Sequence, residues 1–268
     1  MIETVDPIIK VRDLVKRFGD RTVLDGLNLD IPSGKITVIM GGSGCGKSTF
    51  LRHLIGLHTP SEGSIHIDGD NIVGLNEKKM NGVRRKFGML FQGAALFNSM
   101  TVGANVALPL KEHTDLSDDI IKIIVKVKLE LVGLTGFEDF FPYQISGGMK
   151  KRVALARAIA LDPKIVFYDE PGAGLDPITA SMIDQLILDL SRKLKITSVV
   201  VTHEMKSAFR IGDQMIILQK GKVLEVGTAE QIQNSKNPYV RQFVHGEHEG
   251  VIPFKQTSDA YLKGLLES

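Results

Sequence analysis

A glycine-rich loop followed by lysine and serine carries the clearest chemical signal in the chain. It fits the pattern G-x-x-x-x-G-K-[ST] and lies between a short apolar run at 36–40 and a helical run at 49–55. Glycines let backbone N–H groups converge on phosphate oxygens, and the start of the following helix adds positive potential. We expect Lys47 to reach the β and γ phosphates of a nucleotide and Ser48 to bind Mg²⁺. The predicted phosphate-binding residues are Gly41, Gly42, Ser43, Gly44, Cys45, Gly46, Lys47, Ser48 and Thr49.

A second candidate anion site lies at Ser146. This serine is a suitable N-cap, and Gly147 and Gly148 leave backbone N–H groups bare at the start of a helical pattern over 150–160. The segment 92–149 has a helical pattern of its own, so its anion site is not expected to fold onto its own glycine loop. The economical interpretation is that it caps the phosphate held by a second copy of the chain. The alternative is an ordinary helix cap followed by solvated basic residues at 150–152.

Four apolar runs typical of strands end in polar or glycine residues. They lie at 36–40, 87–91, 165–168 and 197–201. The first leads into the glycine loop, and the others lead into Gln92, into Asp169 and Glu170, and into Thr202 and His203. In open α/β sheets ligands bind at the carboxyl ends of the strands. The four strand ends therefore predict one shared site.

The arrangement of these runs predicts a parallel α/β sheet with two additions. Residues 8–11 and 23–29 indicate short strands of an N-terminal antiparallel flank. From Gln92 to about residue 160 the pattern becomes helical, with Ser117 as N-cap of a helix over 120–125, which indicates an inserted helical subdomain at about 93–160.

The C-terminal part after Gly221 has no clear period but keeps spaced apolar residues. We expect a main domain over 1–232 and an extension over 233–268 that packs either on a partner subunit or back on its own domain. The apolar anchors of this extension are Tyr239, Val240, Phe243, residues 251–254 and Tyr261.

Composition narrows the class of protein. The 33 basic and 31 acidic residues give a net charge of +2, which is too even for a protein whose main work is to grip nucleic acid. The single cysteine, Cys45, fits a reducing compartment. The N-terminus shows no secretion signal, and no apolar run approaches the roughly 20 residues that span a bilayer. We therefore expect a soluble chain whose membrane role comes through partners.

Taken together and in this order, the motifs resemble those of ATP-binding-cassette (ABC) transporter ATPases from about residue 8 to residue 230. Ser146-Gly147-Gly148-Met149 resembles their signature motif. The resemblance implies an α/β fold of the P-loop NTPase (RecA-like) type. Three stretches, 91–97, 105–110 and 237–254, look closer still to the ATPases of the Mla/Mce-type lipid transporters, which act between inner and outer membranes.

The resemblance also implies roles at the predicted sheet edge. Asp169 would hold Mg²⁺ through water, and Glu170 would polarise the attacking water, as in the Walker B motif. Gln92 matches the Q-loop glutamine, which senses Mg²⁺ and the attacking water. His203 matches the switch histidine that contacts the γ-phosphate. The candidate catalytic residues are thus Glu170, His203 and Gln92, and the candidate metal ligands are Ser48, Gln92 and Asp169.

Further positions match the family pattern or depart from it. Phe18 occupies the usual place of an aromatic that stacks on adenine, with core packing as the alternative. Asp176 resembles the D-loop aspartate that communicates across the dimer interface. The usual signature is Leu-Ser-Gly-Gly-Gln, whereas this chain has Ile145 and Met149, and hydrolysis is still expected because the serine and backbone donors remain. Cys45 is either an oxidation-sensitive point or inert packing.

The function implied by the resemblance is an ATP-hydrolysing subunit, with ATP and Mg²⁺ as cofactors, that energises phospholipid transport through a separate permease. Its helical lobe over 93–145 would dock a coupling helix of that permease. The implied partners are a second copy, integral-membrane permease subunits, a small regulatory subunit and an MCE-type lipid-binding subunit, without nucleic acid. The chain would lie at the cytoplasmic side of the inner membrane. The alternatives are the ATPase of an importer for a small polar solute, and a division-type ABC ATPase without transport.

Overall fold

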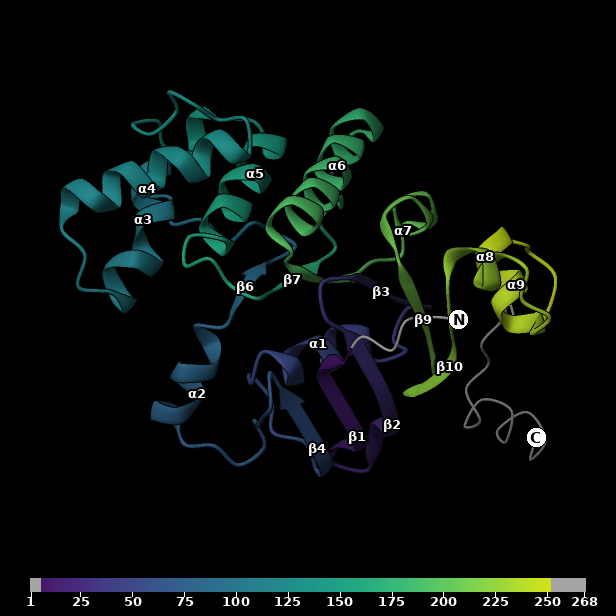
Figure 1. Cartoon of the computed structure of the whole chain (residues 1–268). Coiled ribbons are helices and arrows are strands. Elements are labelled where there is room, and N and C mark those ends of the chain that lie inside the picture. The colour runs from purple at the N-terminus through teal and green to yellow at the C-terminus, as the bar shows by residue number, and fades with distance from the viewer. Residues whose placement is uncertain (1–5, 252–268) are drawn as a thin grey trace, which may run out of the picture.

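Two sheets organise the chain, and the computed structural model describes them within residues 6–251 (Figure 1). Among the described residues the larger sheet has the order β10-β9-β3-β8-β7-β6. Its neighbours pair in parallel except β9 and β10, which are antiparallel. The predicted parallel α/β core is therefore confirmed. Its strands are β3 (Ile36–Gly41), β6 (Phe87–Leu90), β7 (Ile165–Asp169), β8 (Thr197–Val201), β9 (Gln214–Gln219) and β10 (Lys222–Gly227).

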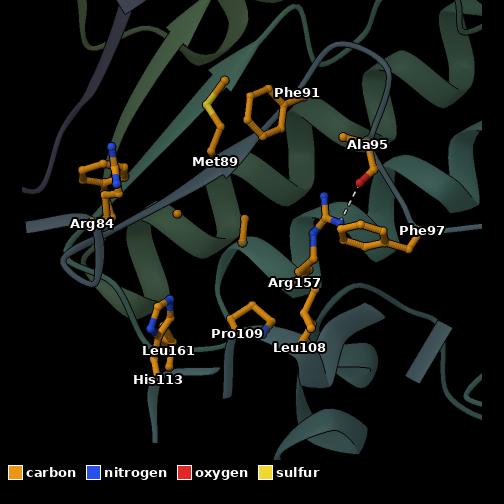
Figure 2. A pocket seen from close by; sticks show the side chains of 13 residues that line it. Arg84, Met89, Phe91, Ala95, Phe97, Leu108, Pro109, His113, Arg157 and Leu161 are labelled. Atoms are coloured by element: carbon orange, nitrogen blue, oxygen red, sulfur yellow. Dashed lines mark hydrogen bonds between the residues drawn. The ribbon is translucent and has the colours of Figure 1, made fainter. Parts of the chain in front are cut away.

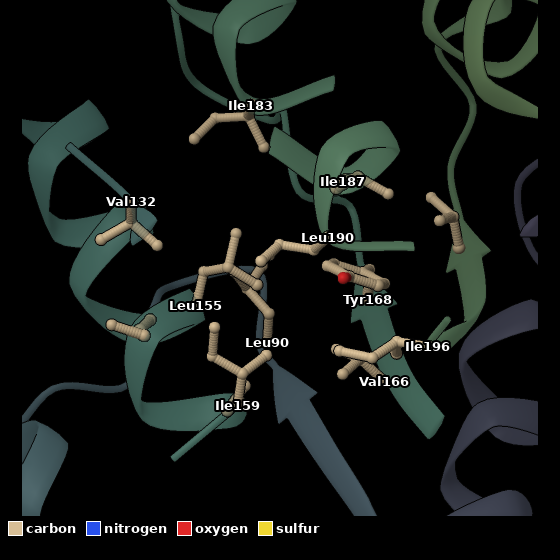
Figure 3. Close-up of a cluster of buried hydrophobic side chains, with 14 of the residues drawn as sticks. Leu90, Val132, Leu155, Ile159, Val166, Tyr168, Ile183, Ile187, Leu190 and Ile196 are labelled. Carbon is tan, nitrogen blue, oxygen red and sulfur yellow. The ribbon is translucent and has the colours of Figure 1, made fainter. Parts of the chain in front are cut away.

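The central strands are apolar on both faces because both faces of the sheet are covered. Val38 and Tyr168 belong to a cluster shared with α5 (Gly147–Ala158) and α6 (Pro177–Leu194). Figure 3 shows Tyr168 among side chains of these two helices. Ile39 follows Val38 in sequence, and Phe167 precedes Tyr168. Both belong to a second cluster, which they share with α1 (Lys47–Leu54) and the antiparallel sheet. Successive side chains on a strand point to opposite faces, so α1 and α5 lie on opposite sides of the sheet.

The second sheet is the predicted antiparallel flank, with the order β2-β1-β4-β5. Its first two strands are longer than the sequence indicates. Arg12 and Asp13 interrupt the alternation of buried and exposed residues, and Asp13 has a φ of 47° at a register shift. This bulge hides the continuity of the strand. The strands are β1 (Pro7–Phe18), β2 (Arg21–Pro32), β4 (Glu62–Ile67) and β5 (Asp70–Asn71).

The helical insertion comprises α3 (Val102–His113), α4 (Asp118–Leu131), a 3-10 turn η1 (Pro142–Gln144) and α5. Ser117 is the N-cap residue of α4 as predicted, although its side chain makes no capping hydrogen bond. Residues 93–101 are not helical, so the first helix begins later than expected, where the Thr101 side chain caps it. Within residues 93–101, Ala94 and Ala95 adopt left-handed backbone conformations, with φ of 62° and 50°. The remaining helices are α2 (Glu77–Arg84), α7 (Met205–Ile211), α8 (Ala229–Gln233) and α9 (Pro238–His245).

The described part of the C-terminal extension folds back on its own domain. Val240 of α9 is fully buried and joins the cluster that contains Tyr168, as does Ile232 of α8, the last residue of the expected main domain. Residues 252–254 and Tyr261, also predicted as anchors, lie outside the described residues. The predicted contact of the extension with a partner subunit stays a prediction. Within residues 6–251, no helix has both the length and the apolar character required to cross a membrane.

Because Val240 is fully buried, we expect Val240→Ala to lower the free energy of unfolding by about 2 kcal/mol through loss of packing. Arg241→Ala, at an exposed position on the same helix, is the matched control and should change it by less than about 0.5 kcal/mol. Denaturant unfolding of both variants measures the difference. Equal stabilities would contradict the packing of α9 on this domain.

Candidate nucleotide site

The phosphate loop connects β3 to α1, and its glycines adopt backbone conformations that other residues avoid. Gly41, Gly44 and Gly46 have φ of 151°, 73° and 107°. At Gly41 and Gly46 the neighbours also leave no room for a side chain, whereas nothing lies within 4 Å of a Cβ on Gly44. A Cβ on Gly41 would lie 2.3 Å from the Leu218 carbonyl oxygen, and one on Gly46 would lie 2.7 Å from a Leu24 side-chain carbon. The pattern of glycines is therefore a steric requirement of this turn.

The Lys47 side chain folds over the loop from the start of α1. Its Nζ donates hydrogen bonds to the carbonyl oxygens of Gly41 (2.7 Å) and Gly42 (3.1 Å). Phosphate oxygens carry negative charge, so they would bind this ammonium more strongly than the neutral carbonyl oxygens do. Ser48 is exposed beside it. The ammonium, the loop N–H groups and the Ser48 hydroxyl thus meet at one helix N-terminus, which is the arrangement that binds phosphate.

The sulfur of Cys45 is buried beneath this loop. The residue is 6% exposed, and burial raises the pKa of its thiol, although the nearby Lys47 charge opposes that rise. A buried neutral thiol is a poor nucleophile. The structure therefore favours inert packing over an oxidation-sensitive role.

Asp169 ends β7 next to the phosphate loop. Burial raises the pKa of its carboxyl, and so does the negative charge of Glu170. The positive charges of Arg52, Lys151 and Lys47 act in the opposite direction. The carboxylate therefore lies within electrostatic reach of the loop lysine, as the strand-end argument predicts.

The Glu170 side chain is held by hydrogen bonds from the neighbouring strand end at this sheet edge. The Glu170 backbone is left-handed, with a φ of 48°, which is costly for a residue other than glycine. One carboxylate oxygen lies 2.8 Å from His203 Nδ1, and the other accepts a hydrogen bond from the Thr202 hydroxyl (3.1 Å). The ends of β7 and β8 thus bring Glu170 and His203 together. The hydrogen bond from Thr202 to Glu170 is not among the contacts expected from the sequence, although Thr202 lies at a predicted strand end.

Gln92 reaches this edge through its backbone. Its side chain is exposed, and its carbonyl oxygen accepts a hydrogen bond from the Lys151 ammonium. Lys151 also donates to the Glu170 carbonyl oxygen (3.3 Å). Lys151 is only 5% exposed, so the interpretation of 150–152 as solvated basic residues is wrong at this position. The burial arises because α5 packs against β6.

The signature residues open α5, where the Ser146 hydroxyl accepts the Met149 N–H (3.2 Å). A Cβ on Gly148 would lie 2.4 Å from the Thr179 side chain, so this glycine allows α5 to approach α6. The Asp176 carboxylate caps α6 by accepting two backbone N–H groups at 3.0 Å. Within residues 6–251, no hydrogen bond joins Ser146–Gly148 to the phosphate loop. The structure does not bring the second anion site onto the first.

Phe18 lies at the end of β1 with 47% of its surface exposed, which argues against core packing. Its ring meets His58 edge-on at 5.7 Å between centroids, and the Lys16 Nζ lies 5.0 Å from its centroid. His58 in turn contacts His53 of α1, at 5.5 Å between centroids. The exposed ring is therefore linked to the helix that follows the phosphate loop.

Comparison with known proteins identifies the architecture that carries this site. The sequence model of the ABC transporter family matches residues 24–173, which include the phosphate loop, the signature and Glu170. The chain belongs to the ABC transporter family. The predicted P-loop fold and the predicted enzyme class, an ABC-type ATP hydrolase, are thereby confirmed.

Two relatives and one solved structure place the chain within the ABC family. The intermembrane phospholipid transport system ATP-binding protein MlaF of Haemophilus influenzae is 44% identical over 97% of this chain and 98% of its own length. The probable ribonucleotide transport ATP-binding protein mkl of Mycobacterium leprae is 44% identical over 94% of this chain and 72% of its own. The ATP-binding cassette MJ0796, in a dimeric post-hydrolysis state bound to ADP and Pi, superposes with a TM-score of 0.76 at 34% identity, covering 82% of this chain and 98% of that one. The predicted similarity to Mla-type ATPases is confirmed.

Proposed function

We propose that the chain is the ATP-hydrolysing subunit of a transporter that moves phospholipid between membranes through a separate permease. The observation that carries the hydrolytic part is the Glu170 carboxylate, held by Thr202 and His203 at the sheet edge that also carries the phosphate loop. The cargo rests on the near-complete alignment with MlaF, which is named for phospholipid transport.

In this proposal, the loop N–H groups and Lys47 bind the phosphates, and Phe18 stacks on adenine. Glu170 orients the attacking water and accepts its proton while the γ-phosphoryl group leaves the β-phosphate oxygen. The His203 ring is 60% exposed, so it can keep its bond to Glu170 and still contact the γ-phosphate. Gln92 lies just after β6, and its exposed amide can contact the attacking water.

The oxygen atoms at this edge fit Mg²⁺. Asp169 supplies a half-buried carboxylate and Ser48 a hydroxyl, and both are the hard ligands that Mg²⁺ prefers. In residues 6–251 there is no group of three or more His, Cys, Asp or Glu side chains that could hold a metal alone. Mg²⁺ is usually held by one or two carboxylates with water and substrate phosphates, which suits this set. Bound there, the ion would neutralise charge on the β and γ phosphates.

A second copy of the chain would complete each site. Ser146 and its neighbouring N–H groups open a helix on the face of the sheet opposite α1, away from their own phosphate loop. In a head-to-tail pair they would cap the γ-phosphate of the partner, and Asp176 would lie at the same interface. MJ0796, which aligns with 82% of the chain, forms a dimer with ADP and Pi bound.

The permease would dock in a groove between the parallel sheet and the helical insertion. The groove has a volume of about 400 Å³ and includes Phe91, Phe97, Leu108 and Pro109 in its lining (Figure 2). The two phenylalanines are 38% and 50% exposed. A groove lined mainly by apolar side chains can hold the apolar face of a short amphipathic helix of a membrane partner.

We expect Phe97→Ala to weaken permease binding about fivefold or more, because truncated aromatic anchors typically cost over about 1 kcal/mol. Leu57→Ala, at a 58% exposed position after α1 and outside this groove, is the control for loss of exposed apolar surface. Copurification with the permease and permease-stimulated ATPase rates measure the effect. Unchanged stimulation in Phe97→Ala would argue against this docking groove.

A polar cargo is the second candidate, because the mycobacterial relative is named for ribonucleotide transport. Copurification separates the two: a lipid permease supports the leading proposal, and a periplasmic solute-binding protein supports the alternative. Copurification with a cell-division complex and no transported cargo would indicate the third candidate, a division-type ABC ATPase. The small regulatory subunit, the MCE-type subunit and the location at the cytoplasmic side of the inner membrane follow from the leading proposal, and the same copurification tests them.

A further inference from the structure

We propose that Lys151 is a positioning residue that ties the permease groove to the catalytic glutamate through the signature helix α5. The inference deepens the proposed function and rests on it for the identity of the permease. The positioning role of Lys151 is inferred from its burial and its hydrogen bonds, independently of which permease binds.

In the described part of the chain, three basic side chains of α5 bind backbone carbonyl oxygens instead of carboxylates. Lys151, Arg152 and Arg157 all donate hydrogen bonds to backbone carbonyl oxygens, and within residues 6–251 none of them forms a salt bridge. Arg152 donates to the carbonyls of Val132 and Gly133 at the end of α4. A helix that carries three such cations is anchored to three separate segments of backbone.

Lys151 is the most deeply buried of the three, at 5% exposure. A buried ammonium is costly unless its donors are satisfied. The acceptors of Lys151 are the carbonyl oxygens of Gln92 and Glu170, which follow two neighbouring strands, β6 and β7. A change in the position of Gln92 relative to Glu170 must therefore break or stretch one of these bonds.

The other end of α5 is fixed to the same segment of the chain. Arg157 donates to the carbonyls of Ala94 (2.9 Å) and Ala95 (2.7 Å), the two residues with left-handed backbone. Figure 2 shows the second of these bonds at the wall of the groove. Arg157 thus binds the strained turn at Ala94 and Ala95, which borders the groove. Lys151 binds Gln92, which lies just before that turn.

The contacts form a continuous physical path from the groove to the catalytic edge. Displacement of residues 94–95 by a docked partner would move Arg157 and α5 as one rigid helix. Lys151 would pass that displacement to the Glu170 backbone. Since Glu170 already has a strained left-handed conformation, a small shift of its carbonyl changes where its carboxylate points.

The test compares two substitutions of Lys151 in the full chain. Lys151→Met keeps the length and packing but removes every donor, and Lys151→Gln keeps a neutral donor. We expect kcat for ATP to fall about tenfold in the Met variant and about threefold in the Gln variant, because small misplacements of a catalytic group cost rate. The KM for ATP should stay within about twofold of the wild type in both, because Lys151 does not contact the phosphate loop.

Lys150→Met is the matched control, since Lys150 precedes Lys151 on the same helix and, among the described residues, donates no side-chain hydrogen bond. It should leave kcat and KM unchanged. Thermal unfolding of each variant identifies any that fail to fold. If Lys151→Met does not fold, the Gln variant decides alone: a reduced kcat at unchanged KM supports the proposal, and a wild-type kcat overturns it. A folded Met variant with wild-type kcat, or equal losses in Met and Gln, also overturns it.

The same variants in complex with the permease test the coupling. We expect permease stimulation of hydrolysis to be present in the wild type and in Lys150→Met and to be lost in Lys151→Met. Retained stimulation in Lys151→Met would contradict the coupling path. Absence of stimulation in the wild type would count against the proposed function instead, while the kcat and KM comparison in the isolated chain would still decide the role of Lys151.

Discussion

Glu170→Gln is expected to reduce ATP hydrolysis by about a thousandfold, because general-base catalysis contributes roughly 10²–10⁴-fold. The amide keeps the size of the side chain and can still accept the hydrogen bond from Thr202, so nucleotide binding should remain. With hydrolysis blocked, the ATP-bound pair should accumulate. Sedimentation of the variant with ATP and Mg²⁺ should therefore show a dimer that dissociates when ATP is removed.

Glu230→Gln is the matched control for this variant. Glu230 is an exposed residue of α8, and among the described residues its side chain forms no hydrogen bond or ion pair. It should hydrolyse ATP at the wild-type rate. If Glu170→Gln stays monomeric with ATP, the site shared between two copies is wrong. If it hydrolyses ATP at the wild-type rate, the assignment of the catalytic carboxylate is wrong.

Lys47→Ala should weaken nucleotide binding severely. The ammonium lies at the mouth of the phosphate loop, where Gly41 and Gly42 hold it. Loss of charge-assisted bonds worth up to about 3 kcal/mol predicts an increase in Kd of roughly a hundredfold. Calorimetric titration with ATP measures it directly.

Lys35→Ala removes an exposed lysine just before β3, the strand whose other end leads into the phosphate loop. This variant should bind ATP normally. This control separates a local effect of Lys47 from a change in overall charge. Near-normal affinity in Lys47→Ala would discredit the phosphate loop as the nucleotide site.

The strand ends explain why much of the site was predictable. Parallel strands deliver their carboxyl ends to one edge whatever the length of the connections between them. Asp169, Glu170 and His203 could therefore be grouped with the phosphate loop before any distance was known. The glycine pattern was equally informative, since at Gly41 and Gly46 both the backbone angles and the neighbouring atoms exclude a side chain.

Lys151 and the turn at Ala94 and Ala95 could not be predicted in the same way. Lys151 stands between Lys150 and Arg152, and a run of basic residues usually indicates a solvated surface. Its burial depends on packing of α5 against β6, which is far away in sequence. The left-handed alanines carry no glycine or asparagine signal, and Arg157 holds their carbonyls from 62 and 63 positions away.

The C-terminal helices show a further limit of periodicity. α8 spans five residues and α9 spans eight, which is too short for a helical period to stand out from its surroundings. Their stability comes from Ile232 and Val240, which are buried against the main core. Such tertiary stabilisation of short helices has no local signature.

The most direct test of the central claim is phospholipid movement in vesicles that contain this chain and its permease. A fluorescent phospholipid placed in one compartment is followed after addition of ATP and Mg²⁺, with Glu170→Gln as the inactive control. We predict movement that requires ATP, occurs with the wild-type chain and is absent with Glu170→Gln. Intact ATP hydrolysis by the wild-type complex without any phospholipid movement would contradict the account.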